Sequence, residues 1–177
     1  LFADPLSLVK IWQGGMSFHG AMLCGTLSFV WMSRHYQINF WKLSDAAVVH
    51  LPVTFILVRL ANFINGELCG RVTSSSWGVA NPKCGIYNTY PSQLFEAFGE
   101  GVVLWAIVYF ISKKSNKTGS VSMSFLAGYA IIRFIIETFF RAPTYELTQA
   151  ISSGQILCLI MLSLTVLMSV SCWKNKC

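Results

Sequence analysis

Five apolar stretches, separated by polar or charged segments, dominate the hydropathy pattern of the chain. Each is about 17 to 21 residues long, which is enough for a helix to cross about 30 Å of hydrocarbon. The pattern therefore predicts an all-α, polytopic helical membrane protein with a single membrane-embedded domain over residues 1–177. The five predicted transmembrane helices are 17–33, 45–63, 92–111, 120–140 and 153–172.

The polar segments between these stretches differ in their charge. Alternate segments and the tail hold seven basic residues: Arg34, Lys42, Lys113, Lys114, Lys117, Lys174 and Lys176. The segments on the other side hold four: Lys10, Arg71, Lys83 and Arg141. By the positive-inside rule, the first group is cytoplasmic. We therefore expect the 64–90 loop, rich in Ser, Gly, Asn and Pro, to face outward, with Trp77 as an interfacial anchor.

Composition supports this fold class, because 54% of the 177 residues are hydrophobic and only 11% are charged. Soluble domains carry about 25% charged residues. A net charge of +6 would indicate nucleic acid in a soluble protein, whereas here it reflects the distribution of loops, and no nucleic-acid partner is expected. The chain opens on Leu1 without a cleavable signal, so we expect a piece that lacks its natural N-terminus.

The six cysteines show no Cys-x-x-Cys pair and no metal-like His/Cys spacing, so no metal site and no cofactor is predicted. Cys24, Cys158 and Cys172 lie in apolar stretches, where a cysteine is usually a small buried hydrophobe. Cys69 and Cys84 flank one loop and would be able to pair if that loop is exported. The spacing alone leaves this open.

Arg59 lies near the outer end of the second predicted helix. An arginine at the centre of a bilayer costs about 3 kcal/mol on insertion scales, so its presence needs a reason. Asn62 shares its helix face, Gly66 offers a break, and Glu67 and Arg71 follow at the membrane boundary. This arrangement suits a site for a charged headgroup. The alternative interpretation is a snorkelling arginine followed by a polar loop.

Other costly polar groups fall at a similar depth in the predicted topology. They are His19 in the first helix, Gln93, Glu96 and Glu100 in the third, and Tyr129, Arg133 and Glu137 on one face of the fourth. Charges in membrane spans usually pair, so the simplest alternative is a set of internal salt bridges: Arg133 with Glu137, or Arg59 with Glu96 or Glu100. Convergence of all of them toward one leaflet favours a site.

The chemistry that suits such a site is limited. Two arginines can hold a phosphate through forked, charge-assisted hydrogen bonds, and a nearby histidine can exchange a proton near neutral pH. No serine hydrolase motif and no phosphate-loop spacing is visible. From the residues alone we predict an outer-leaflet site for an anionic phospholipid, and leave open whether it is catalytic.

Several ordered segments resemble prolipoprotein diacylglyceryl transferases. The segment Arg59-Leu-Ala-Asn-Phe-Ile-Asn-Gly-Glu-Leu-Cys-Gly70 is close to the family's recognition motif, with Ala61 where the family usually has Gly. Residues 12–20, Trp-Gln-Gly-Gly-Met-Ser-Phe-His-Gly, look like its histidine segment. Residues 91–96, Pro-Ser-Gln-Leu-Phe-Glu, are similar to its Pro-Ser-Gln-Leu-Tyr-Glu helix start. Residues 129–143 resemble its late Tyr, Arg and Glu cluster, and 153–155 the start of its last helix.

The resemblance implies transfer of the diacylglyceryl group of phosphatidylglycerol to the lipobox cysteine thiol of prelipoproteins, the first step of bacterial lipoprotein maturation. It places the enzyme in the bacterial inner membrane as a multi-pass protein, with its active site toward the outer leaflet. The implied partners are phosphatidylglycerol, the prelipoprotein signal peptide with its lipobox cysteine, and membrane lipid. The implied catalytic residues are His19, Tyr129, Arg133 and Arg59, and the implied substrate-binding residues are Arg59, Asn62, Asn65, Glu67, Glu96, Arg133 and Glu137.

Some features depart from the family pattern. Tyr90 stands where the family usually has His before Pro91. Thr138 is an extra residue after Glu137, and on a regular helix it would rotate Arg141 by about 100°. The family has seven spans against five predicted here, which agrees with missing N-terminal spans. Residue patterns leave two alternatives open: a non-catalytic phospholipid-binding subunit and a transporter subunit. Binding alone would need neither His19 nor Tyr129.

Overall fold

The computed structural model describes residues 18–85, 87–142, 146–148 and 151–175. The described chain is mostly helical and divides into two compact units, residues 1–43 and 44–177. The first unit holds α1 (Phe18–His35) and the start of α2 (Phe40–Val48). Side-chain–backbone bonds from Ser33 and Gln37 close the turn after α1.

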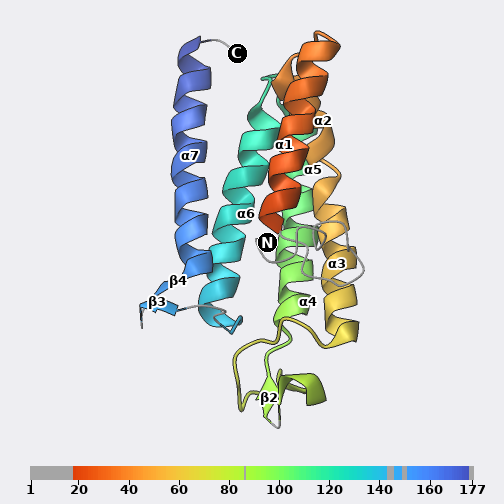
Figure 1. Ribbon diagram of the computed structural model, residues 1–177, viewed down its shortest axis with the longest axis vertical. Coiled ribbons are helices and arrows are strands. Elements are labelled where there is room, and N and C mark those ends of the chain that lie inside the picture. The colour runs from red at the N-terminus through yellow and green to blue at the C-terminus, as the bar shows by residue number, and fades with distance from the viewer. Residues whose placement is uncertain (1–17, 86, 143–145, 149–150, 176–177) are drawn as a thin grey trace, which may run out of the picture. The chain divides into compact units, whose positions relative to one another are not determined.

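The second unit holds the remaining helices. They are α3 (Leu51–Asn65), α4 (Ser92–Glu96), the π-helical segment η4 (Ala97–Val103), α5 (Leu104–Lys114), α6 (Ser120–Phe139) and α7 (Ser153–Asn175). The segments α4, η4 and α5 run on from one another and pack against both α3 and α6, while α7 lies along α6 (Figure 1). The core is formed by Val48, Leu104, Val108, Val121 and Phe125.

Helices lie over all five ranges that the hydropathy pattern predicts. Among the described residues, Ser92–Lys114 and Ser120–Phe139 are each long and apolar enough to cross a membrane. The pair α2 and α3, bent by 42°, adds a third if it forms one span. Length and composition of the described helices thus support a helical membrane protein with two or three spans, where the sequence predicts five.

The bend between α2 and α3 follows from local chemistry. Pro52 lies at the start of α3, where its missing N–H costs nothing because the first turn of a helix has no partner for it. The carboxylate of Asp45, on α2, accepts hydrogen bonds from the backbone N–H groups of Gly119 (2.6 Å) and Ser122 (2.8 Å). The Asp45 side chain thereby caps the beginning of α6, where the backbone N–H groups have no partner within the helix. This contact joins α2 to α6 and is separate from the bend at Pro52.

The segment between α3 and α4 is the predicted outward loop. It contains β1 (Val79–Ala80), the short 3-10 helix η3 (Pro82–Cys84) and β2 (Asn88–Thr89), with β1 and β2 paired antiparallel. Cys69 and Cys84 form a disulfide, which settles the pairing that spacing alone left open. A second hairpin, β3 (Glu146–Thr148) and β4 (Ile151–Ser152), leads into α7.

Candidate active site

Arg59 lies on α3, and the end of this helix is set by Gly66. The residue adopts the left-handed conformation at φ 66°, which glycine reaches at little cost. The N–H of Glu67 bonds to the carbonyl of Asn62 (2.9 Å), and the N–H of Gly66 bonds to that of Phe63 (3.1 Å). This is a Schellman motif, and it confirms the break predicted at Gly66.

Glu96 and Glu100 come from the junction of α4 and η4, and both are buried, with 0% and 1% of their surfaces exposed. Two glycines let neighbouring helices approach this segment. A Cβ on Gly101 would lie 2.2 Å from Cγ1 of Ile56 on α3, and one on Gly99 would lie 2.8 Å from a methyl of Ile132 on α6. A π-helical segment inside a longer helix is often found at a functional site.

The third arginine, Arg141, follows the end of α6. The carbonyl of Ile136 accepts hydrogen bonds from both Phe140 N–H (2.9 Å) and Arg141 N–H (3.1 Å), so the last turn is wider than an α-turn. The helix therefore does not stay regular after Thr138, and the expected rotation of Arg141 by about 100° does not apply. Its guanidinium lies against Glu96 (Nη1 to Oε1, 2.6 Å).

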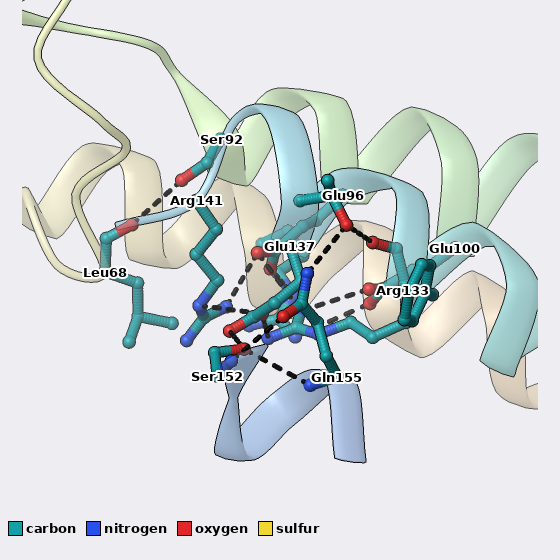
Figure 2. A network of polar contacts seen from close by, with 12 residues as sticks. Leu68, Ser92, Glu96, Glu100, Arg133, Glu137, Arg141, Ser152 and Gln155 are labelled. Atoms are coloured by element: carbon teal, nitrogen blue, oxygen red, sulfur yellow. Dashed lines mark hydrogen bonds and ion pairs between the residues drawn. The ribbon is translucent and has the colours of Figure 1, made fainter. Parts of the chain in front are cut away.

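Together these side chains form an arginine–glutamate cluster, defined as Arg59, Arg133, Arg141, Glu96, Glu100 and Glu137. Figure 2 labels all of these residues except Arg59. Glu96 is at its centre, because it contacts all three guanidinium groups. Arg59 Nε lies 2.7 Å and Arg133 Nη1 lies 3.1 Å from its carboxylate oxygens. Arg133 Nη1 also lies 3.1 Å from Glu100, and Arg133 Nη2 lies 3.3 Å from Glu137. Three positive and three negative charges make the cluster neutral.

The two kinds of charge differ in accessibility. The arginine side chains are 17%, 14% and 11% exposed for Arg59, Arg133 and Arg141, whereas the glutamates are between 0% and 5% exposed. The arginine side chains are therefore the more accessible members of the cluster. Such a surface is suited to an anion that can use forked hydrogen bonds.

Glu137 is also held by the start of α7. Ser152 N–H bonds to the Gln155 side-chain oxygen (2.9 Å) while Gln155 N–H bonds to Ser152 Oγ (3.2 Å), which is a reciprocal capping box. Ser152 Oγ also donates to Glu137 Oε1 (3.2 Å). A Cβ on Gly154 would lie 2.7 Å from the same oxygen, so glycine leaves room for the carboxylate. The N-terminal end of α7 thus stabilises a negative charge on Glu137.

The structure brings together four of the residues predicted for the site: Arg59, Glu96, Arg133 and Glu137. The ion pairs expected from the alternative interpretation are formed as well: Arg59 with Glu96 and Glu100, and Arg133 with Glu137. Convergence of all the predicted polar groups, His19 included, stays a prediction. Tyr129, one helical turn before Arg133, packs its ring 5.7 Å from that of Phe55 and 6.3 Å from that of Phe125.

Other predicted residues lie at the edge of this arrangement or outside it. Asn62 is half-buried in the last turns of α3, whereas Asn65 and Glu67 are exposed. The backbone carbonyls of Asn65 and Glu67 accept bonds from Lys83 Nζ (2.8 Å) and Gln93 Nε2. His19 falls in the first turn of α1, and its side chain lies outside the described residues. Its predicted role, like every residue role above, stays a prediction.

Glu100, which the sequence placed only among the polar groups at a similar depth, is missing from the predicted catalytic and binding residues. So are Arg141, Ser152 and Gln155, which form or support the cluster. A signal existed for two of them, since Ser-x-x-Gln directly before an apolar run is a capping-box pattern. Arg141 lies beyond the predicted helix. Continuing a regular helix past Thr138 would have rotated its side chain by about 100°.

Comparison with known proteins gives a consistent result. A family model described as prolipoprotein diacylglyceryl transferase matches residues 1–171. Phosphatidylglycerol--prolipoprotein diacylglyceryl transferases from Glaesserella parasuis serovar 5 and Geobacter sulfurreducens are each 41% identical to the chain. Both matches cover 98% of the chain, and they cover 66% and 68% of the two relatives. The corresponding protein of Pseudoalteromonas atlantica is 43% identical over 88% of the chain and 58% of its own length. The chain thus spans between 58% and 68% of the length of these three relatives.

Proposed function

The chain belongs to the prolipoprotein diacylglyceryl transferase family, and on this basis we propose that it transfers the diacylglyceryl group of phosphatidylglycerol to the lipobox cysteine thiol of prelipoproteins. The bond between the glyceryl carbon and the phosphate oxygen breaks, and a carbon–sulfur bond forms. The products are a thioether and glycerol phosphate, and the thiol proton passes to a base. The reaction is the first step of bacterial lipoprotein maturation.

The pairing of partly exposed arginines with buried carboxylates in the arginine–glutamate cluster is the observation that carries the proposal. Arg59 and Arg133 expose 17% and 14% of their side chains, and buried carboxylates hold them from behind. Both are therefore oriented before a ligand arrives. Preorganised donors stabilise charge that develops on a leaving group, and here that group is the phosphate of glycerol phosphate.

The nucleophile needs a base, because only the thiolate attacks well and a free thiol has a pKa near 8.5. Two residues are suited to this role. His19 has the unperturbed pKa closer to neutrality, and Tyr129 lies one turn from Arg133 on α6. Asn62, Asn65 and Glu67, at the end of α3 and just beyond it, would bind or orient the headgroup.

The proposed setting is the bacterial inner membrane, crossed by five helices, with the site toward the outer leaflet. Helices over all five predicted ranges support the count. The disulfide between Cys69 and Cys84 supports the orientation, since disulfides persist on the oxidising, exported side of a membrane. The excess of Lys and Arg in the opposite loops agrees with it.

The test uses the complete natural protein in detergent, with phosphatidylglycerol and a lipobox peptide followed by mass spectrometry. We expect a diacylglyceryl mass gain that requires the peptide cysteine and is lost in His19→Ala and in Arg59→Ala. Lys113→Ala, a lost positive charge at the end of α5, is the matched control and should keep its activity. If phosphatidylglycerol binds but the peptide gains no mass, the proposed transferase activity is wrong and the protein is a lipid-binding protein.

A further inference from the structure

Residues 67–71, which follow the C-cap of α3, form a backbone strap that contacts the start of α4 and the end of α6. The first half of this strap is fastened to the start of α4. The carbonyl of Glu67 accepts a hydrogen bond from Gln93 Nε2, and the carbonyl of Leu68 accepts one from Ser92 Oγ (3.1 Å; Figure 2). Both donors are buried, with 2% and 0% of their surfaces exposed. The strap therefore fixes the helix that carries Glu96.

The second half of the strap is fastened to the end of α6. Gly70 forms an antiparallel bridge with Arg141, and Arg71 N–H donates to the carbonyl of Phe140 (2.9 Å). Arg71 Nε also donates to the carbonyl of Arg141 (3.0 Å). A Cβ on Gly70 would lie 2.1 Å from the Tyr90 carbonyl oxygen, so only glycine permits this approach. The backbone of Arg141 is thus held by the strap while its guanidinium contacts Glu96.

The disulfide links the strap to η3. Cys69, in the middle of the strap, is bonded to Cys84 at the end of η3. The neighbouring Lys83 donates from Nζ to the carbonyl of Asn65 (2.8 Å), at the end of α3. A cation at this end of a helix is favourably placed. The strap therefore contacts α4 and α6, continues from α3, and is cross-linked to η3 by the Cys69–Cys84 disulfide.

We propose that this disulfide makes the strap a redox-dependent positioning device for the site, acting through Arg141. The proposal rests on the proposed function. With the disulfide intact, the strap holds Arg141 against Glu96, and Glu96 in turn aligns Arg59 and Arg133. A dithiol reduces the bond by thiol–disulfide exchange: two electrons convert Cys69 and Cys84 to thiols, and the dithiol becomes its cyclic disulfide. Arg141 is then free to leave Glu96.

The expected effect of reduction is a fall in kcat of about tenfold, the effect of weakening one charge-assisted contact. KM for phosphatidylglycerol should change little, because Arg59 and Arg133 remain present and alignment acts mainly in the transition state. The loss should reverse on reoxidation. The double variant Cys69→Ser/Cys84→Ser should show the lowered kcat from the outset, and dithiothreitol should not change it further. Cys24→Ser, which removes an exposed free thiol of α1, is the matched control and should respond as the unmodified protein does.

A double-mutant cycle separates positioning from general support. If the disulfide acts through Arg141, then the losses from Arg141→Lys and from Cys69→Ser/Cys84→Ser do not add. Additive losses would overturn the proposed route, and an unchanged kcat after complete reduction, checked by alkylation and mass spectrometry, would overturn the device.

Hydrogen exchange at the amides of Arg71 and Arg141 is measured in the same samples and does not depend on activity. Faster exchange after reduction supports the device, and unchanged exchange overturns it. An oxidised protein without transferase activity, but with exchange that responds to reduction, would overturn the proposed function and leave the device standing.

Discussion

Arg133→Lys separates the charge of this arginine from its forked shape. The guanidinium uses two nitrogens for three carboxylates: Nη1 lies 3.1 Å from both Glu96 and Glu100, and Nη2 lies 3.3 Å from Glu137. A lysine ammonium is a single point charge and cannot span the positions of both nitrogens. At least one charge-assisted hydrogen bond is lost, which is about 1.5 to 3 kcal/mol. If the same fork holds the phosphate in the transition state, kcat/KM should fall by about 10- to 150-fold.

The measurement is diacylglyceryl transfer to a lipobox peptide, with kcat and KM determined separately and thermal unfolding in detergent as the folding control. Arg133→Ala should abolish transfer, because three carboxylates would then face two arginines, and breaking a buried pair costs about 3–5 kcal/mol. The reasoning is refuted if Arg133→Lys retains the unmodified kcat/KM. A lysine would then serve as well as the fork, and charge alone would explain the residue.

Two further substitutions test the packing around the site. Gly101→Ala places a methyl 2.2 Å from Ile56 Cγ1 and should destabilise the protein by about 1–3 kcal/mol. Adding Ile56→Ala should restore part of the lost unfolding midpoint, and a double variant less stable than Gly101→Ala alone would contradict the assigned clash. Asp45→Ala removes the cap of α6 and should lower stability by about 0.5–2 kcal/mol. It should accelerate hydrogen exchange in the first turn of α6 while leaving KM unchanged, and unaltered exchange there would show that the cap is dispensable.

Much of the cluster could be predicted from the sequence, because charged residues are rare in membrane helices and two of them here are one helical turn apart. Arg133 and Glu137 are four residues apart on one helix, so their pairing follows from helical geometry alone. Arg59 and Glu96 are far apart in the chain, and their contact was anticipated because an unpaired arginine in a span is expensive. The position of each group along its predicted helix, combined with the positive-inside rule, was sufficient to predict that these groups lie at a similar depth in the membrane.

What sequence reasoning missed depends on irregular backbone. The π-helical segment Ala97–Val103 leaves no mark on hydrophobic periodicity, since the residues around it read as one apolar helix. Arg141 was projected from a regular helix, but the carbonyl of Ile136 accepts two N–H groups and widens the last turn. The disulfide depends on a Cα–Cα distance of 5.8 Å between Cys69 and Cys84, a distance that only the folded loop creates.

The neutrality of the arginine–glutamate cluster has a consequence for biosynthesis. No single helix is neutral by itself at this site apart from α6, whose Arg133 and Glu137 compensate each other. α3 emerges from the ribosome with Arg59 unpaired, and the α4–η4 segment follows with two carboxylates. Each isolated charge costs about 2.5–3.5 kcal/mol to insert, so α3 and the following helix are expected to enter the bilayer together, as a hairpin. A nascent chain arrested before α6 would carry one uncompensated negative charge in the membrane. Because α6 adds one charge of each sign, this negative charge is balanced only by Arg141, which follows α6, and the chain should remain bound to the insertion machinery until Arg141 arrives.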